Sequence, residues 1–264
     1  MRDFDGKIVL VTGAATGLGA ALAIGAASRG ARAVILNYSK SATEAEATAA
    51  AVRAAGAEAV LAQGDVAEDA DCRAVAAAAA PFGRIDALAN NAGVTKYASN
   101  HGDLDALARE DFERLYAVNV VGPFQMIRAA RSLLEASGRA SVLMVSSIAA
   151  VTGIGSSVAY AASKGALNTM TLSLARALAP KIRVNAVCPG FIDTRWHAQG
   201  MSAEAIDAMR AAAKARTPLQ AGSSAEDMAD AGLFFMSNAS RHVTGETLLV
   251  DAGLHLGFAT FAQR

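Results

Sequence analysis

Cysteine is scarce in this 264-residue sequence, which contains only Cys72 and Cys188. Two cysteines placed this far apart lack the close spacing of a metal-binding motif. We therefore expect two buried thiols rather than a disulfide, and we predict no metal site.

Net charge is also absent, because 24 Lys and Arg residues balance 24 Asp and Glu residues. A neutral chain gives no electrostatic reason to expect a nucleic acid or an anionic membrane surface as a partner. No uninterrupted apolar run is long enough to cross a bilayer. Met1–Asp5 contain no apolar leader, so we expect a cytoplasmic protein.

Hydrophobic residues make up 53% of the chain, and short apolar runs alternate with amphipathic stretches. The runs expected to form strands are Lys7–Val11, Ala33–Leu36, Ala59–Ala62, Ile85–Ala89, Ser141–Val145, Arg183–Val187 and Thr247–Val250. The stretches expected to form helices are Ala20–Arg29, Ala42–Ala55, Asp69–Ala80, Glu110–Ser137, Val158–Leu178, Ala203–Lys214 and Ala225–Met236. The alternation predicts an α/β fold, with a Rossmann-type doubly wound parallel sheet of about seven strands and helices on both faces. Residues 1–264 are expected to form a single domain.

A glycine-rich segment, Thr12-Gly-Ala-Ala-Thr-Gly-Leu-Gly19, connects the first expected strand to the first expected helix. Glycines permit a tight turn and close approach of the backbone to a phosphate, and a helix N-terminus attracts the anion. The glycine spacing differs from that of the usual dinucleotide fingerprint. The strand–turn–helix context nevertheless favours nucleotide binding over a purely structural turn.

Tyr160 and Lys164 are four residues apart in an expected helix, so their side chains share one face. Free tyrosine has a pKa near ~10, and a nearby ammonium group lowers it. A tyrosine tuned in this way beside a serine hydroxyl suits proton transfer to or from a carbonyl or alcohol oxygen. Ser147 is the expected serine. The alternative for Tyr160 and Lys164 is an ordinary helical face without a function. The alternative for Ser146 and Ser147 is a cap at the end of a strand.

These motifs together resemble the short-chain dehydrogenase/reductase family, in its compact branch that includes 3-oxoacyl-(acyl carrier protein) reductases. The markers stand in order as Thr12–Gly19, Asp65, Asn90-Asn-Ala-Gly93, Asn119, Ser147, Tyr160-x-x-x-Lys164 and Pro189-Gly190. The resemblance extends from Lys7 to Gly253. Several motifs in the right order are far more specific than any one of them.

The resemblance implies a role for each catalytic candidate. Tyr160 would be the general acid/base, and Lys164 would lower its pKa and hold the nicotinamide ribose. Ser147, rather than Ser146, would polarise the substrate oxygen. Asn119 would hold a water that links Lys164 to solvent, although it could instead be a polar group bonded to its own helix backbone.

The resemblance also implies a set of cofactor contacts in the turns that follow the strands. They are Gly13, Thr16, Gly17, Leu18, Gly19, Asn37, Tyr38, Ser39, Lys40, Asp65, Val66, Asn91, Ala92, Gly93, Tyr160, Lys164, Pro189, Gly190, Ile192 and Thr194. Asp65 is expected to contact the adenine, and a turn or helix-cap aspartate is a compatible alternative.

The second expected strand ends in Asn37-Tyr-Ser-Lys40, without the carboxylate that selects NAD by repelling a 2′-phosphate. Asn37 and Ser39 could donate hydrogen bonds to a phosphate, and Lys40 adds positive charge. NADP(H) is therefore the preferred cofactor. Thr16 stands where NADP-preferring relatives often carry a basic residue, so NAD(H) remains possible.

The substrate is the least determined feature. The family's lid corresponds to about residues 191–218, which include Trp196, and a second wall with His101 is expected at 95–103. Trp196 is expected to anchor the lid, with stacking on a substrate as the alternative, and no catalytic role is assigned to His101. A 3-oxoacyl thioester, another ketone and a sugar lactol all remain possible small-molecule substrates.

Three functions remain open at this point. The first is NADP(H)-dependent interconversion of a carbonyl and an alcohol. The second is an NAD-dependent alcohol or sugar dehydrogenase of the same family, and the third is a non-catalytic nucleotide sensor. Relatives are usually homotetramers, built through the long helices at 110–137 and 158–178 and the last strand. The tail at 255–264 could reach a subunit interface.

Overall fold

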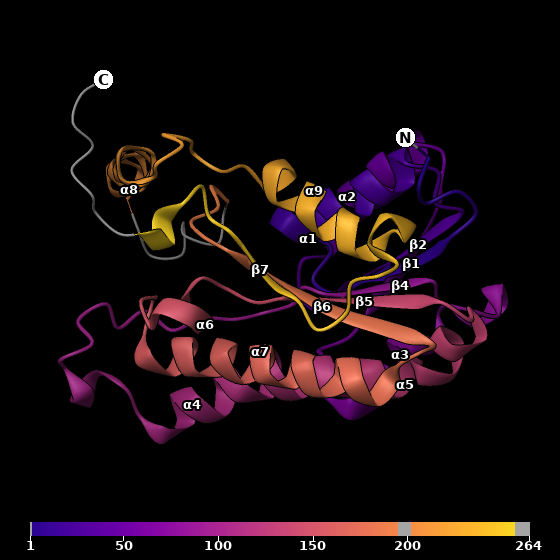
Figure 1. The fold of residues 1–264 in the computed structure, drawn as a ribbon, viewed down its shortest axis with the longest axis horizontal. Helices are drawn as coiled ribbons and strands as arrows, with labels where there is room; N and C mark the ends of the chain where they lie inside the picture. The colour runs from indigo at the N-terminus through magenta and orange to yellow at the C-terminus, as the bar shows by residue number, and fades with distance from the viewer. Residues whose placement is uncertain (1, 195–201, 257–264) are drawn as a thin grey trace.

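The computed structural model describes residues 2–194 and 202–256, in which strands and helices alternate (Figure 1). The strands are β1 Ile8–Val11, β2 Ala33–Tyr38, β3 Glu58–Gln63, β4 Ala87–Asn90, β5 Ala140–Val145, β6 Ile182–Pro189 and β7 Thr247–Val250. The α-helices are α1 Gly17–Ser28, α2 Ala42–Ala54, α3 Asp69–Ala77, α4 Arg109–Tyr116, α5 Gly122–Ala136, α6 Ala149–Thr152, α7 Val158–Leu178, α8 Ala203–Arg216 and α9 Ala225–Met236. None of the described helices is long and apolar enough to cross a membrane.

The strands form one parallel sheet in the order β3-β2-β1-β4-β5-β6-β7. The chain builds outward from β1 in one direction to β3 and then returns to add β4 on the other side. This order confirms the predicted doubly wound, Rossmann-type sheet. It also places a crevice-forming reversal between β1 and β4, at the edge where the strands end.

Helices cover both faces of the sheet, and the strand residues alternate between the two layers. In β1, Ile8 and Leu10 belong to the core under α3, α5 and α7, whereas Val9 and Val11 belong to the core under α1, α2 and α9. Figure 1 shows the same two layers above and below the strands. The period of two along a strand produces this division, and burial on both sides explains why the strands are apolar throughout.

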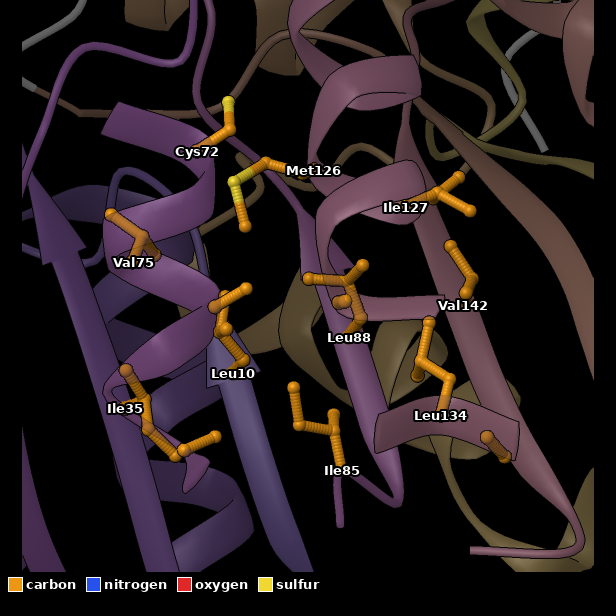
Figure 2. Close-up of a cluster of buried hydrophobic side chains, with 14 of the residues drawn as sticks. Leu10, Ile35, Cys72, Val75, Ile85, Leu88, Met126, Ile127, Leu134 and Val142 are labelled. Carbon is orange, nitrogen blue, oxygen red and sulfur yellow. The ribbon is translucent and has the colours of Figure 1, made fainter. Parts of the chain in front are cut away.

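The core below the sheet is shown in Figure 2, where Leu10, Ile35 and Leu88 from three strands meet side chains of two helices. Cys72 of α3 and Met126 of α5 complete this layer. Both cysteines are buried free thiols, as predicted, and burial raises the pKa of Cys72 to about 12.

The expected helix Glu110–Ser137 is wrong in one respect, because it is divided into α4, a π-helical turn at Ala117–Val121 and α5. The amide of Gly122 bonds to the carbonyl of Ala117, five residues earlier. Pro123 has no N–H to offer to the carbonyl of Asn119, so the ordinary helical ladder cannot continue there. The turn carries Asn119 toward the site.

Candidate active site

The first glycine-rich turn is shaped by positions that have no room for a side chain. Gly13 and Gly17 have φ values of 62° and 58°, which glycine adopts without strain. A Cβ on Gly19 would lie 2.2 Å from the carbonyl oxygen of Gly13. Thr16 precedes α1 and makes no side-chain cap, and Leu18 is buried beneath the turn. An anion could therefore approach the backbone amides at the N-terminus of α1 closely.

This turn is fastened to the turn after β4. The hydroxyl of Thr12 accepts hydrogen bonds from the amides of Asn91 and Ala92, at 2.9 and 3.0 Å. The Asn91 side chain donates to the carbonyls of Thr12 and Gly13, at 3.0 and 3.1 Å. Gly93 continues from this junction. Thr12 was missed as a site residue, although its position directly before the first glycine was visible in the sequence.

Asn37 does not have the role that the sequence suggested. Its side chain is buried, and its amide group donates both hydrogens to the carbonyls of Ala62 and Gly64, at 3.2 and 3.0 Å. Its oxygen accepts from the amide of Gly13 at 3.3 Å. The interpretation of Asn37 as a phosphate donor is therefore corrected, because no donor remains. Asn37 instead ties β2 and β3 to the glycine turn.

Tyr38, Ser39 and Lys40 follow Asn37 at the end of β2. The Tyr38 side chain is half-buried, whereas Ser39 and Lys40 are exposed between β2 and α2. Ser39 and Lys40 are therefore the residues of this segment whose exposed donors could still bind a phosphate.

Asp65 has a structural role that is visible in its contacts. One carboxylate oxygen accepts from the amide of Ala67 at 3.0 Å, and the other lies 3.7 Å from an Arg114 nitrogen. Val66 is buried, and its carbonyl accepts from Gln125 at 3.0 Å. The turn-aspartate alternative is thus satisfied in this structure, and an adenine contact stays a prediction.

The turn after β6 begins with close packing and then becomes open. A Cβ on Gly190 would lie 2.8 Å from the Cβ of Asp251, and Ile148 donates to the Pro189 carbonyl at 2.8 Å. Ile192 pairs with Ser223 in an isolated parallel bridge. Thr194 lies beside the first turn, with its methyl carbon 3.5 Å from a Cβ built on Gly17. The predicted contacts of β1 and β6 thus lie near one another.

The lid region contains the expected helix as α8, Ala203–Arg216. Its Arg210 forms ion pairs of 2.7 Å with Asp193 and with Asp207. A cavity of about 460 Å³ lies between this helix, Phe191 and the 222–224 segment. Trp196, the predicted lid anchor, lies outside the described residues, as do residues 257–264 of the tail.

The structure brings Ser147, Tyr160 and Lys164 together at the ends of β5 and α7. The Ser147 side chain is close enough to the Tyr160 phenol to lower its pKa. The Lys164 ammonium donates to the Val145 carbonyl at 2.9 Å and lies 5.7 Å from the centroid of the Tyr160 ring. Ser146 instead donates its hydroxyl to the Lys164 carbonyl at 3.3 Å and is buried. Of the two serines, Ser147 is the one that faces Tyr160.

The charges of this cluster differ from the sequence-based expectation. Burial raises the pKa of Tyr160 to about 12, and the nearby Ser147 side chain opposes the rise only in part. Burial lowers the pKa of Lys164 to about 8. The expected lowering of the tyrosine pKa is thus corrected for this state: desolvation dominates, and the lysine points to a carbonyl rather than to the phenol oxygen.

Asn119 is fully buried in the π-helical turn and uses its whole side chain within the protein. Its oxygen accepts from the Val94 amide at 2.9 Å, and its nitrogen donates to the Val94 carbonyl and to Ser163, at 3.0 and 3.1 Å. The Ser163 hydroxyl in turn donates to the Tyr160 carbonyl at 2.7 Å. The side chain therefore positions α7, and the predicted water at Asn119 stays a prediction. Sequence reasoning missed Ser163, whose place directly before Lys164 was the available signal.

The comparisons with known proteins cover nearly the whole chain. A family model described as enoyl-(acyl carrier protein) reductase matches residues 13–255. A solved short-chain dehydrogenase/reductase, described as a glucose/ribitol dehydrogenase from Brucella melitensis, has a TM-score of 0.85 and 29% identity. That match covers 96% of this chain and 98% of the other. The chain belongs to the short-chain dehydrogenase/reductase family.

Two further relatives of this short-chain dehydrogenase/reductase have informative names. L-rhamnose 1-dehydrogenase (NAD(P)⁺) from Sphingomonas sp. strain SKA58 is 37% identical over 97% of this chain and 99% of its own length. A gluconate 5-dehydrogenase from Burkholderia cenocepacia J2315, solved with NADP and tartrate, is 32% identical with a TM-score of 0.85. This match covers 97% of this chain and 99% of the gluconate 5-dehydrogenase chain. The protein is accordingly an oxidoreductase that acts on CH–OH or carbonyl groups.

Proposed function

We propose that this enzyme interconverts a carbonyl and an alcohol with NADP(H), with Tyr160 as the general acid/base. The observation that carries the proposal is the proximity of Ser147 and Tyr160 beside a buried Lys164, at the carboxyl edge of the parallel sheet. Two hydroxyl groups that meet there can bind one substrate oxygen from two directions. A nucleotide sensor would have no use for this arrangement.

The residues of the glycine turn fit a dinucleotide. Gly19 allows no Cβ, Gly13 and Gly17 take glycine-specific φ values, and the N-terminus of α1 has no side-chain cap. Gly13, Gly17 and Gly19 would therefore lie against the pyrophosphate, and Tyr160 and Lys164 would lie against the nicotinamide ribose. When bound, the cofactor supplies or accepts the hydride.

The protein itself supplies the proton and the orientation of the substrate. Because the pKa of Tyr160 is raised to about 12, its phenol holds a proton at neutral pH and can donate it to a carbonyl oxygen. Ser147 would orient the same oxygen. Lys164, whose pKa is lowered to about 8, can hold or release a proton near neutrality and so restore the phenol.

The preference for NADP(H) is supported by Ser39 and Lys40, which are exposed where the adenosine ribose would lie. No carboxylate occupies residues 37–40 to repel a 2′-phosphate. With Asn37 removed from the argument, the preference depends on these two side chains, and NAD(H) use stays within the proposal.

The proposed substrate is a 3-oxoacyl compound or another ketone with an apolar body. Tyr97 lies close enough to Tyr160 to raise its pKa, and Phe191 lines the cavity beside α8. An alternative is NAD-dependent oxidation of a sugar or alcohol. The names of the rhamnose and gluconate enzymes favour the sugar substrate and leave the choice of cofactor open. We also propose residues 191–218 as the lid, a single domain over 1–264, and a cytoplasmic homotetramer.

The test is turnover of ketones, 3-oxoacyl thioesters and sugars with each cofactor, for the wild type and for Tyr160→Phe. We expect Tyr160→Phe to lose turnover by about 10²–10⁴-fold, because the proton donor is removed. NADPH binding, measured by fluorescence titration, should remain. Ser147→Ala and Ser146→Ala form a matched pair, and the first should lose far more turnover. Near-normal rates in Tyr160→Phe would overturn the assignment.

A further inference from the structure

The loop after β4 has no regular structure from residue 91 to 100, yet it is attached at several points. Asn119 holds both backbone groups of Val94 at its start. The hydroxyls of Thr95 and Ser156 are hydrogen-bonded, and the amide of Ala98 donates to the Ser156 carbonyl at 2.7 Å. The loop therefore runs along the short turn that precedes α7.

His101 makes the last of these attachments. Its Nε2 lies 3.2 Å from the carbonyl oxygen of Gly155. A carbonyl oxygen only accepts, so Nε2 must carry the hydrogen in this contact. The imidazole is half-buried, and a cavity of about 230 Å³ opens beside it, lined by Leu104, Phe112 and Val158 among others. The hydrogen bond, more than packing, therefore holds the ring in place.

Gly155 lies directly against the tyrosine that the proposed reaction needs. A Cβ built on Gly155 would be 3.4 Å from Cδ1 and 3.9 Å from Cε1 of Tyr160, and 2.9 Å from the Cβ of Ala149. Two residues later, the Ser157 hydroxyl accepts from the Tyr160 amide at 3.1 Å and begins α7. The turn at 155–157 thus supports both the ring and the backbone of Tyr160.

We propose that His101 is a positioning residue, which holds the 155–157 turn against the Tyr160 ring through its hydrogen bond to Gly155. The substrate-side loop thereby fixes the direction of the phenol oxygen. Because a misplaced proton donor slows the chemical step, His101 contributes to kcat without touching the reacting atoms. The inference rests on the proposed role of Tyr160 and extends it to the loop after β4.

The main test compares His101→Phe with His101→Gln. Phenylalanine keeps a ring but removes the donor, whereas the glutamine amide can restore a hydrogen bond to Gly155. With any carbonyl compound that the wild type reduces, His101→Phe should lower kcat about tenfold, and His101→Gln should recover most of it. NADPH affinity should be unchanged in both. His242→Phe, which alters an exposed histidine beyond α9, serves as the control and should match the wild type.

A second readout requires no turnover. In protein labelled with ¹³Cζ-tyrosine, the Tyr160 signal is identified by its loss in Tyr160→Phe. His101→Phe should shift that signal, and the signals of Tyr38 and Tyr116 should stay in place. An unchanged Tyr160 signal would overturn the inference even if the enzyme proved inactive on every substrate. A shifted signal in an inactive wild type would support the positioning and reject the proposed function alone.

Gly155→Ala tests the same contact from the other side. Its methyl group would overlap the Cβ of Ala149 at 2.9 Å and shift the turn that lies against the Tyr160 ring, so kcat should fall at least as much as in His101→Phe. Gly165→Ala is the matched control, because a Cβ there meets nothing nearer than an Ala150 oxygen at 3.9 Å. Equal activity of Gly155→Ala and Gly165→Ala would contradict the inference.

Discussion

The turn after β1 and the turn after β6 reach the same edge of the sheet, yet they are held in different ways. The first is held by hydrogen bonds in which the buried side chains of Thr12 and Asn37 accept and the side chain of Asn91 donates. The second passes from a packed glycine into an ion pair between Asp193 and Arg210, whose side chains are 39% and 49% exposed. Buried hydrogen bonds are expensive to lose, whereas exposed ion pairs contribute little.

Because of this difference, the two sides of the site should tolerate substitutions to different degrees. On the proposed cofactor side, one substitution leaves several buried groups unpaired, so few residue types should be tolerated. On the side of the proposed lid, the contacts can change at small energetic cost, so residues there should vary more freely. The predictions below test this contrast.

The largest effect is expected for Gly19→Ala. The new methyl group would overlap the Gly13 carbonyl oxygen and the Asn91 side chain, at 2.2 and 2.5 Å. We expect loss of NADPH binding and destabilisation by about 3 kcal/mol or more. On the lid side, Gly222→Ala meets no atom within 4 Å and should be neutral. Urea unfolding and NADPH titration measure both, and equal behaviour of the two variants would refute the contrast.

A buried amine should make stability depend on pH. The folded pKa of Lys164 is lowered from 10.5 to about 8, so between these values the unfolded chain binds the proton that the folded chain has lost. Stability therefore rises with pH in this window, by at most about 3 kcal/mol. The raised pKa of Tyr160 acts oppositely above pH 10. In Lys164→Met, the free energy of unfolding measured with urea should rise less between pH 8 and 9.5 than in the wild type. An unaltered dependence on pH would contradict the lowered pKa of Lys164.

Asn37→Asp should lower the stability of the fold, and it should not simply change the preferred cofactor from NADP to NAD. A carboxylate cannot donate to the carbonyls of Ala62 and Gly64, so we expect a loss of about 2 kcal/mol. Lys40→Ala, at an exposed position, should instead lower the NADPH-to-NADH affinity ratio and leave the unfolding midpoint in place. If Asn37→Asp shifted the ratio without loss of stability, the buried role of Asn37 would be wrong.

Arg210→Ala should have the smallest effect on stability, below about 0.5 kcal/mol, because its ion pairs are exposed. Its effect should appear in KM, since the pair with Asp193 links α8 to the turn after β6. Arg131→Ala removes another exposed pair, with Glu135 on α5, and should alter neither quantity. Thermal unfolding and steady-state kinetics distinguish the two variants.

The sheet and most helices were predictable because burial on two faces gives uninterrupted apolar strands. The break at Ala117–Val121 is hidden in the sequence, because the apolar period continues through it, and Pro123 is the only local signal of it. The spacing of Tyr160 and Lys164 predicted their meeting. It could not predict the direction of the tyrosine pKa, which depends on burial and on the carbonyl that Lys164 contacts.

Asn37 and His101 show a second limit of the sequence. An asparagine after a strand carries the same donors whether it faces solvent or two buried carbonyls, and only the register of β2 against β3 decides between them. His101 belongs to a loop without periodicity. Its contact with Gly155 joins segments that are distant in the chain, so no local pattern could indicate it.

The π-helical turn makes the number of residues between α4 and α5 important. A π-turn contains one residue more than the α-helical turn it replaces, and each residue of an α-helix advances the rotation by about 100°. Deleting a single residue from Ala117–Val121 would therefore remove the extra residue and keep α4 and α5 in phase, but the residues of the turn itself would point in new directions. Asn119 would leave the interior, and Val94 and Ser163 would lose it together. Length is thus as strictly specified in this segment as residue identity, and single-residue gaps should be absent from it in any functional variant of the chain.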